Sequence, residues 1–325
     1  MLSRLPLMLG LGVIAAATAS AAANDCDRAC LKTTLDQYLA AVVKHDPAAA
    51  PLFVGFRQTE NAVVVKNGTG LWKTATALGK AQRRYLDPVS GQAAYFGIIE
   101  EGPEQAIVNL RLKVEQRKIT EAEWIVARKN DPGLNGFTAT GAPSGNVWDA
   151  DNLIAGPPSD KILPKDQRTS REALIAITNS YFDGITTHDG SIIMAHPGCT
   201  RVENGNRMAG FPAAAGAKGK GGGGDCTSNL ANINVQNVAA RRYPVVDEET
   251  GVVLAMAIFL RKPGTATRRN VFAEWFVIEN NKIRNIFSAM FYPTSEVPVP
   301  NWPPFDGNWP LSPTLAPPAP PGPAK

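Results

Sequence analysis

The sequence predicts an α+β protein of two tandem cone-shaped domains, each a curved antiparallel sheet wrapped round an N-terminal helix. The first observation is a repeat, because matching residues in two stretches all lie 143 positions apart. The second is a change of pattern within each stretch, from apolar residues at helical spacing to short strand-like runs separated by turn residues. Two copies of one helix-then-sheet unit explain both observations. The matching pairs are Tyr38 and Tyr181, His45 and His188, Asp46 and Asp189, Glu60 and Glu203, and Asn61 and Asn204.

Composition divides the chain into further segments. The first residues predict a secretory signal peptide, because Arg4 precedes an apolar run that ends in small residues. A Gly-rich stretch predicts an insertion in the second domain, and the Pro-rich end is unsuited to a sheet. The expected parts are a signal peptide at 1–23, a first domain at 24–130, a linker at 131–168, a second domain at 169–292 with an insertion at 213–224, and a tail at 293–325.

Charge and cysteine content restrict the compartment and the partners. The net charge is +4 over 325 residues and the basic residues are scattered, which argues against nucleic-acid binding. After the signal peptide, no apolar run is long enough to cross a membrane, so a periplasmic or secreted protein is expected. Four cysteines in an exported chain favour disulfides, and zinc is disfavoured with three histidines in all. Pairing within each repeat predicts Cys26–Cys30 and Cys199–Cys226.

The first domain begins with an amphipathic helix over 27–44, which His45, Asp46 and Pro47 end. A short helical turn at 48–53 should lead into a strand at 57–65. The following segment, 71–78, reads as a short helix or an irregular crossing. Further strands are predicted at 81–86, 92–100, 106–115 and 119–127.

The second domain repeats this order. Ser170 is a plausible N-cap for a helix over 171–187, and strands are expected at 252–260, 271–279 and 283–291. His45 and His188 end the two helices, where a cation is favoured by the helix dipole, so both are interpreted as structural. Apolar residues of the linker, namely Trp148, Leu153 and Ile154, should fix it to the domains.

Several motifs resemble the SnoaL-like group of the nuclear-transport-factor-2-like superfamily. The resemblance covers about 30–130 and 170–292. It implies a cone whose apolar pocket opens at one end, on a scaffold that hosts isomerases, dehydratases, cyclases, hydrolases, lyases and binding domains. The motifs are Arg57–Asn61 with Gly70–Trp72, Arg111–Val114 with Lys118–Glu123, and Arg201–Gly205 with Glu274–Ile278.

The resemblance also implies where a site should lie. Enzymes of the superfamily, such as ketosteroid isomerase, place a tyrosine on the first helix and a carboxylate base on the first strand. Tyr38 and Tyr181 match the tyrosine, but the aspartate position falls on Asn61 or Asn204, with a glutamate one residue earlier. One step along a strand reverses the face. Either a bulge turns the glutamate inward or another residue, such as a histidine, is the base.

The candidate catalytic residues belong to the second domain. His196 stands where the first copy has Phe53, which suggests that this copy diverged towards chemistry. The alternative is that Glu203 faces solvent or pairs with Arg201, that Tyr181 belongs to an ordinary core, and that His196 is structural. The candidates are Tyr181, His196, Arg201, Glu203 and Asn204.

In the first domain the candidates are ligand-binding residues. Arg111, Glu121 and Glu123 fall on adjacent strands, where they form either a buried charge network at the mouth of the cone or a ladder facing water. The candidate binding residues are Tyr38, Arg57, Glu60, Asn61, Trp72 and Arg111.

These residues favour an exported lyase or isomerase that works without a cofactor on a small aromatic or polycyclic substrate. A buried carboxylate gains basicity by desolvation, and a tyrosine can stabilise an enolate or phenolic oxyanion. No phosphate-binding loop, dinucleotide fingerprint or metal motif occurs in the sequence. The alternative is a binding or scaffold module whose two domains pack sheet to sheet. The expected partner is a small hydrophobic or aromatic ligand. Formation of a homo-oligomer is also compatible with the sequence.

Overall fold

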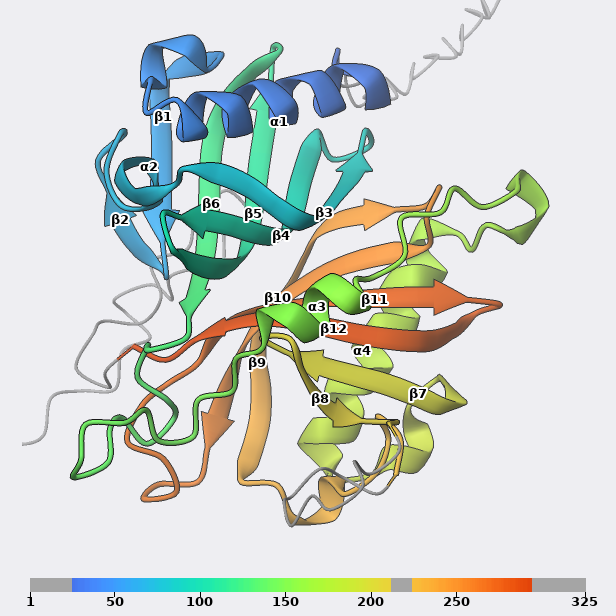
Figure 1. Ribbon diagram of the computed structural model, residues 1–325. Helices are drawn as coiled ribbons and strands as arrows, with labels where there is room; N and C mark the ends of the chain where they lie inside the picture. The colour runs from blue at the N-terminus through green and yellow to red at the C-terminus, as the bar shows by residue number, and fades with distance from the viewer. Residues whose placement is uncertain (1–24, 212–223, 294–325) are drawn as a thin grey trace, which may run out of the picture.

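The computed structural model describes residues 25–211 and 224–293. The expected signal peptide, nearly all of the Gly-rich insertion and the Pro-rich tail after Pro293 lie outside the described residues. Figure 1 shows the first domain, coloured blue to green, above the second, coloured yellow-green to red.

The first domain starts with helix α1, whose first turn is capped by the side chain of Asp27. Strands follow in the predicted order. The elements are α1 (Arg28–Val43), η1 (Pro47–Ala49), β1 (Leu52–Glu60), β2 (Val63–Val65), α2 (Leu71–Thr74), β3 (Ala77–Asp87), β4 (Gln92–Glu101), β5 (Glu104–Glu115) and β6 (Lys118–Arg128).

The second domain repeats the series after a linker. Its first helix has the predicted bounds, and its N-cap is Ser170. The linker contains α3 (Ala150–Ala155) and η2 (Lys165–Gln167). The domain consists of α4 (Arg171–Thr187), η3 (Gly190–Ile192), β7 (Ala195–Glu203), β8 (Asn206–Ala209), η4 (Leu230–Asn232), β9 (Val235–Asp247), β10 (Val252–Arg261), β11 (Val271–Glu279) and β12 (Lys282–Phe291).

Each domain contains a six-stranded sheet, ordered β2-β1-β6-β5-β4-β3 in the first and β8-β7-β12-β11-β10-β9 in the second. The sheets are mixed, which corrects the expected antiparallel arrangement, because β1 runs parallel to β6 and β7 runs parallel to β12. The predicted strand at 57–65 is also wrong. It starts earlier, at Leu52, and breaks at Asn61 and Ala62, whose positive φ angles of 50° and 67° reverse the chain.

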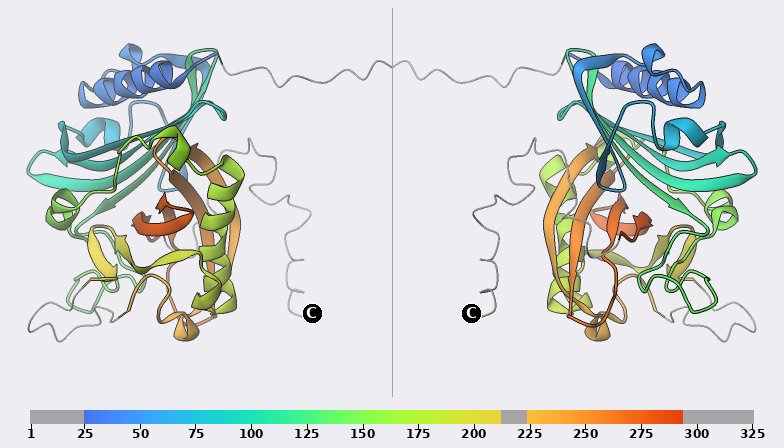
Figure 2. Two further views of the ribbon diagram at one scale, coloured as in Figure 1. Left: turned by 90° about the vertical axis from the view of Figure 1, so that its right-hand side faces the viewer. Right: turned by 90° about the vertical axis from the view of Figure 1, so that its left-hand side faces the viewer.

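Each sheet has an inner face, which carries the domain's long helix, and an outer face, which meets the other sheet. Leu35, Tyr38 and Val42 of α1 pack on the inner face of the first sheet. In the second domain, Tyr181 and Phe182 of α4 pack with Phe276. The outer faces share one apolar core to which both sheets contribute, and Figure 2 shows the two helices outside the pair of sheets.

Two reciprocal ion pairs connect the domains. Arg28, at the start of α1, donates to both carboxylate oxygens of Asp247 at 2.7 and 2.9 Å. Arg171, at the start of α4, donates to both oxygens of Asp87 at 2.9 and 2.8 Å. Both aspartates are fully buried and lie in the hairpins before β4 and β10. The interface is therefore approximately two-fold symmetric, with each helix start bound to the other domain's hairpin.

The linker and the disulfides complete the frame. Leu153 is buried, while Trp148 and Ile154 pack against the shared outer-face core. The predicted disulfides Cys26–Cys30 and Cys199–Cys226 are both confirmed. Within the described ranges, the longest apolar helix is too short to span a bilayer.

Candidate functional site

The first candidate pair, Asn61 and Asn204, forms side-chain hydrogen bonds to the backbone of the neighbouring strand in each sheet. In the second domain the Asn204 amide donates to the carbonyl of Met290 at 3.0 Å and accepts from its N–H at 2.7 Å. Asn61 makes the same two bonds to Val126 in the first domain. Both asparagines have positive φ, which this residue type tolerates well. Each side chain thus substitutes for a peptide group where the parallel strand ends.

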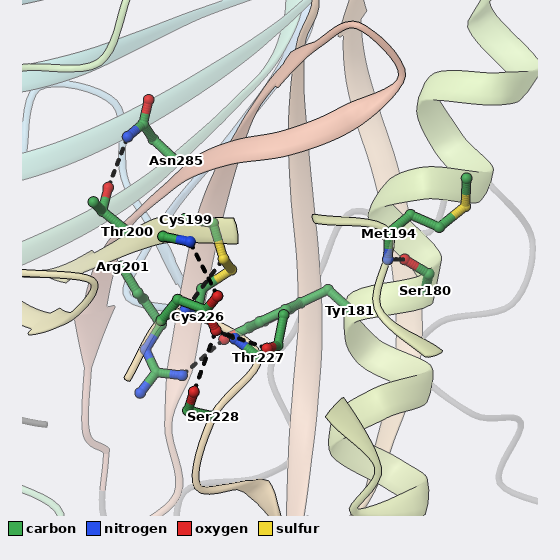
Figure 3. The surroundings of a disulfide bond; sticks show 12 residues. Ser180, Tyr181, Met194, Cys199, Thr200, Arg201, Cys226, Thr227, Ser228 and Asn285 are labelled. Carbon is green, nitrogen blue, oxygen red and sulfur yellow. Dashed lines mark hydrogen bonds between the residues drawn. A yellow bond between two sulfur atoms is a disulfide. The ribbon is translucent and has the colours of Figure 1, made fainter. Parts of the chain in front are cut away.

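The second domain brings three of the candidate catalytic residues together on its inner face. Arg201 of β7 donates from Nη1 to the hydroxyl oxygen of Tyr181 on α4 at 3.0 Å, beside the disulfide (Figure 3). Its Nε lies 3.1 Å from Oε1 of Glu203, a contact of charges without the alignment of a hydrogen bond. The side chains of Arg201 and Glu203 are 22% and 19% exposed, so this cluster is accessible from solvent.

A second glutamate, Glu274 of β11, lies deeper on the same face. Its residue is 3% exposed, and Phe272 and Phe276 flank it on the inner face of the strand. Burial, and after it the charge of Glu203, raise the pKa of Glu274 to about 8, while the charge of Arg201 acts in the opposite direction. Glu274 is therefore protonated at neutral pH and can donate a proton.

Buried polar atoms surround these groups. The Oε2 atom of Glu274, the hydroxyl of Ser288 and the hydroxyl of Thr178 have no hydrogen-bond partner among the described residues. Ser288 is the cross-strand neighbour of Glu274 and also of Glu203. Thr178 lies one helical turn before Tyr181. Unpartnered buried polar groups are costly, so this arrangement suits a polar ligand or water.

Equivalent positions in the first domain are filled by apolar contacts. Trp124 takes the place of Ser288, since it is the neighbour of Glu60 on β1, and Leu110 takes the place of Glu274. Tyr38 donates to Gln58 at 2.9 Å, and the indole of Trp72 donates to the same oxygen at 2.7 Å. All of these side chains are buried. The inner face of the first domain is thus a packed aromatic core.

Glu60 of the first domain has a local structural contact. Its Oε2 accepts from the backbone N–H of Leu71 at 2.8 Å, at the start of α2. Burial raises its pKa, and the Leu71 N–H counteracts this shift. The equivalent glutamates therefore differ, since Glu203 pairs with an arginine and Glu60 holds a helix start.

The structure does not bring the remaining candidates into this cluster. His196 contacts the backbone carbonyl of Glu279 at 2.8 Å, at the hairpin between β11 and β12. Arg57 alternates with Gln58 and so faces away from the inner side. His188 ends α4 as a left-handed C-cap and contacts the carbonyl of Val235, and His45 contacts the carbonyl of Trp72. Each of these histidines therefore contacts a backbone carbonyl away from the cluster.

Arg111 and its network are buried, but they lie in the interface between the domains, which neither of the two interpretations predicted. It is fully buried and donates to Glu123 and Glu121 at 2.8 Å each. Glu123 in turn accepts from Arg242 of the second domain at 2.8 Å. The network is buried on the outer face, so Arg111 does not face a ligand on the inner face.

A cleft of about 400 Å³ between the domains is lined by Arg28, Asp87 and Asp247 together with Arg168 and Glu249. Its charges already pair with one another. Arg28 also lies 3.1 Å from Glu249, and Arg168 lies 3.3 Å from the same carboxylate. This cleft is therefore a weaker site than the inner face of the second domain.

Sequence reasoning missed Glu274 and Ser288 as site residues. A signal for Glu274 exists, because it is the single acid within the apolar run of β11 before Glu279. An acid inside a strand that is buried on both faces is unusual. Ser288 carries no such signal, since its importance depends on the pairing of β12 with β7 and β11.

Comparison with known protein families gives a match to the second domain. A family model described as a domain of unknown function (DUF8021) matches residues 167–290. A search of curated proteins found no match. The matched part contains α4, the second sheet except for Phe291 at the end of β12, and the cluster around Tyr181.

Proposed function

We propose that the second domain is an α+β cone of the SnoaL-like type that performs acid–base chemistry as a cofactor-independent lyase or isomerase. The observation that carries this proposal is the meeting of Tyr181, Arg201, Glu203 and Glu274 on one inner face. Converging titratable groups are typical of an enzyme site. A small aromatic or polycyclic substrate suits the phenylalanines beside them.

The two carboxyl groups have different roles in this proposal. Glu203 is paired with Arg201 and accepts a proton from the substrate. Glu274, with a pKa of about 8, is protonated at neutral pH and returns a proton to the product or leaving group. A pair of carboxyl groups in unlike environments is the general way in which acid and base roles are divided.

Tyr181 and Arg201 stabilise the negative charge that develops. The arginine bond uses the Tyr181 oxygen as acceptor, which leaves the hydroxyl proton to be donated to an enolate or phenolic oxyanion. Burial raises the pKa of Tyr181, so the hydroxyl keeps its proton. Arg201 is held by two partners and is pre-oriented for this task.

The first domain supports the second without catalysis in this proposal. Its aromatic core satisfies Tyr38 internally, and Glu60 is committed to α2. The alternative function, binding of a ligand without turnover, requires a pocket lined by apolar side chains with a single anchor. The polar inner face of the second domain favours catalysis over that alternative. The two disulfides are compatible with a periplasmic or secreted location.

The test is a panel of aryl and keto substrates assayed with matched glutamine variants. We expect kcat/KM to fall by roughly 10²–10⁴-fold in Glu203→Gln and in Glu274→Gln. The equivalent change Glu60→Gln is the control and should leave activity within about twofold, as should His196→Ala. Absence of turnover across the panel, or wild-type rates in both site variants, would refute the proposal.

A further inference from the structure

The inner face of the second domain carries a second arginine that the proposed chemistry does not use. Arg261 is the last residue of β10 and is half-buried. Its guanidinium lies 5.8 Å from the centroid of the Phe259 ring, which packs on the inner-face core. The buried Nε of Arg261 has no hydrogen-bond partner among the described residues.

Arg261 belongs to the same electrostatic cluster as the proposed site. Burial lowers the pKa of its guanidinium, while Tyr292 and Glu203 act in the opposite direction. The neighbouring groups therefore compensate its charge incompletely. Among the described residues, both Arg201 and Arg261 have Glu203 as a neighbouring carboxyl group, while Glu274 is protonated at neutral pH.

At the equivalent positions of the first domain, acidic side chains outnumber the basic one. Its β4 ends in Glu101, where β10 ends in Arg261. Glu101 accepts from Arg128 through both oxygens, at 2.6 and 2.7 Å, and Glu60 adds a further carboxyl group. Tyr292 is the counterpart of Arg128, because the two residues lie equally far after the lysines that begin β12 and β6. A closed ion pair in the first domain thus corresponds to an incompletely compensated cation in the second.

Other charged side chains near α4 do not cancel this excess. Arg241 lies 2.6 Å from Asp183 and forms its own pair there. Among the described residues, the remaining groups that couple to Glu203 are Tyr181 and Tyr292, whose pKa values burial raises so that both are neutral. The inner face therefore has a local excess of positive charge.

We infer that this face binds a small organic anion, an aromatic carboxylate or an acidic phenol, whose charged group is held by Arg261 while the ring lies towards Tyr181. The inference deepens the proposed function by naming its ligand class. Arginine suits this task because its planar donors match a carboxylate with two parallel hydrogen bonds. Arg261 is a positioning residue for the ligand and takes no part in proton transfer.

The experiment compares three pairs of probes of nearly equal shape in which a neutral carboxamide replaces the carboxylate: benzoate with benzamide, 2-naphthoate with 2-naphthamide, and phenylacetate with phenylacetamide. Binding to the full chain is measured by calorimetry at pH 7. We expect the anion to bind more tightly in at least one pair, and Arg261→Gln to weaken that anion by about tenfold. The exposed Arg284→Gln is the control and should change neither affinity.

Two further measurements separate binding from folding and from turnover. Arg261→Lys keeps the charge and should retain part of the preference for the anion, and added salt should reduce that preference in the wild type. Equal affinity for anion and amide in every pair, or unchanged anion binding in Arg261→Gln, would overturn the inference. Anion binding without turnover of any substrate would uphold it while refuting the proposed catalysis.

Discussion

The two domains share a backbone frame but differ in what fills the inner face. Both have a helix tyrosine, a glutamate on the strand that follows and an asparagine that closes the sheet. In the first domain Trp124 and Leu110 complete an apolar core, whereas the second has Ser288 and Glu274 at these places. The comparison teaches that a duplicated fold can keep one copy for stability while the other gains polar groups that cost stability.

The largest predicted effect breaks the packed copy. Trp124→Ala should lower the free energy of unfolding by about 4 kcal/mol, because it removes a buried indole that contacts Tyr38 and leaves a cavity. The matched change Ser288→Ala should stay within about 0.5 kcal/mol, since its hydroxyl has no partner among the described residues. Urea denaturation measures both. Similar losses in the two variants would show that the inner faces are equally packed.

The second prediction concerns the interface, where the domains are alike. Asp87→Asn and Asp247→Asn should each cost about 3 kcal/mol, because each removes the buried carboxylate of an ion pair between the domains. Asp36→Asn, which disrupts partly exposed pairs with Lys32 and Arg84, should cost less than about 1 kcal/mol. Thermal and urea unfolding provide the values. A large difference between the two interface variants would contradict the approximate symmetry.

The third prediction uses the raised pKa of Glu274. Its folded-state pKa of about 8 lies above the ordinary value of 4.5, so the folded protein binds this proton more tightly than the unfolded chain. The stabilisation is present below pH 4.5 and is lost as the pH rises to 8, by on the order of 5 kcal/mol. Glu274→Gln should flatten this part of the pH profile of unfolding, whereas the exposed Glu172→Gln should not. A wild-type profile that is flat between pH 5 and 8 would show that Glu274 is ionised throughout.

The smallest predicted difference is the one between the two disulfides. The Cys199–Cys226 bond closes a separation of 27 residues and the Cys26–Cys30 bond closes one of 4. Loop-closure entropy predicts losses of about 3.5 and about 2 kcal/mol when each pair is replaced by serine, a difference of about 1.5 kcal/mol. Melting of the two double variants tests the order. A reversed order would mean that local packing, and not chain entropy, decides their contributions.

The sequence was sufficient for the repeat, the helix at Arg171–Thr187 and the strand at Val271–Glu279, because local periodicity and capping determine these elements. It was insufficient for the parallel pairing of β1 with β6, which depends on contacts between distant segments. The site residues were predictable from the sequence to the same extent. Tyr181, Arg201 and Glu203 come from one local stretch and were predicted, while Glu274 joins them through strand pairing alone.

The exchange of arginine and aspartate between the halves has a consequence for how the protein can be cut. Arg28 and Asp87 belong to one copy, yet each finds its counter-charge in the other copy, as do Arg171 and Asp247. A fragment ending in the linker would expose the apolar outer face of the first sheet. It would also leave the carboxylate of Asp87 without its arginine. Such a fragment would have to form a homodimer, with Arg28 of each copy paired to Asp87 of the other, to become soluble. The chain therefore behaves as a dimer whose subunits are already tethered.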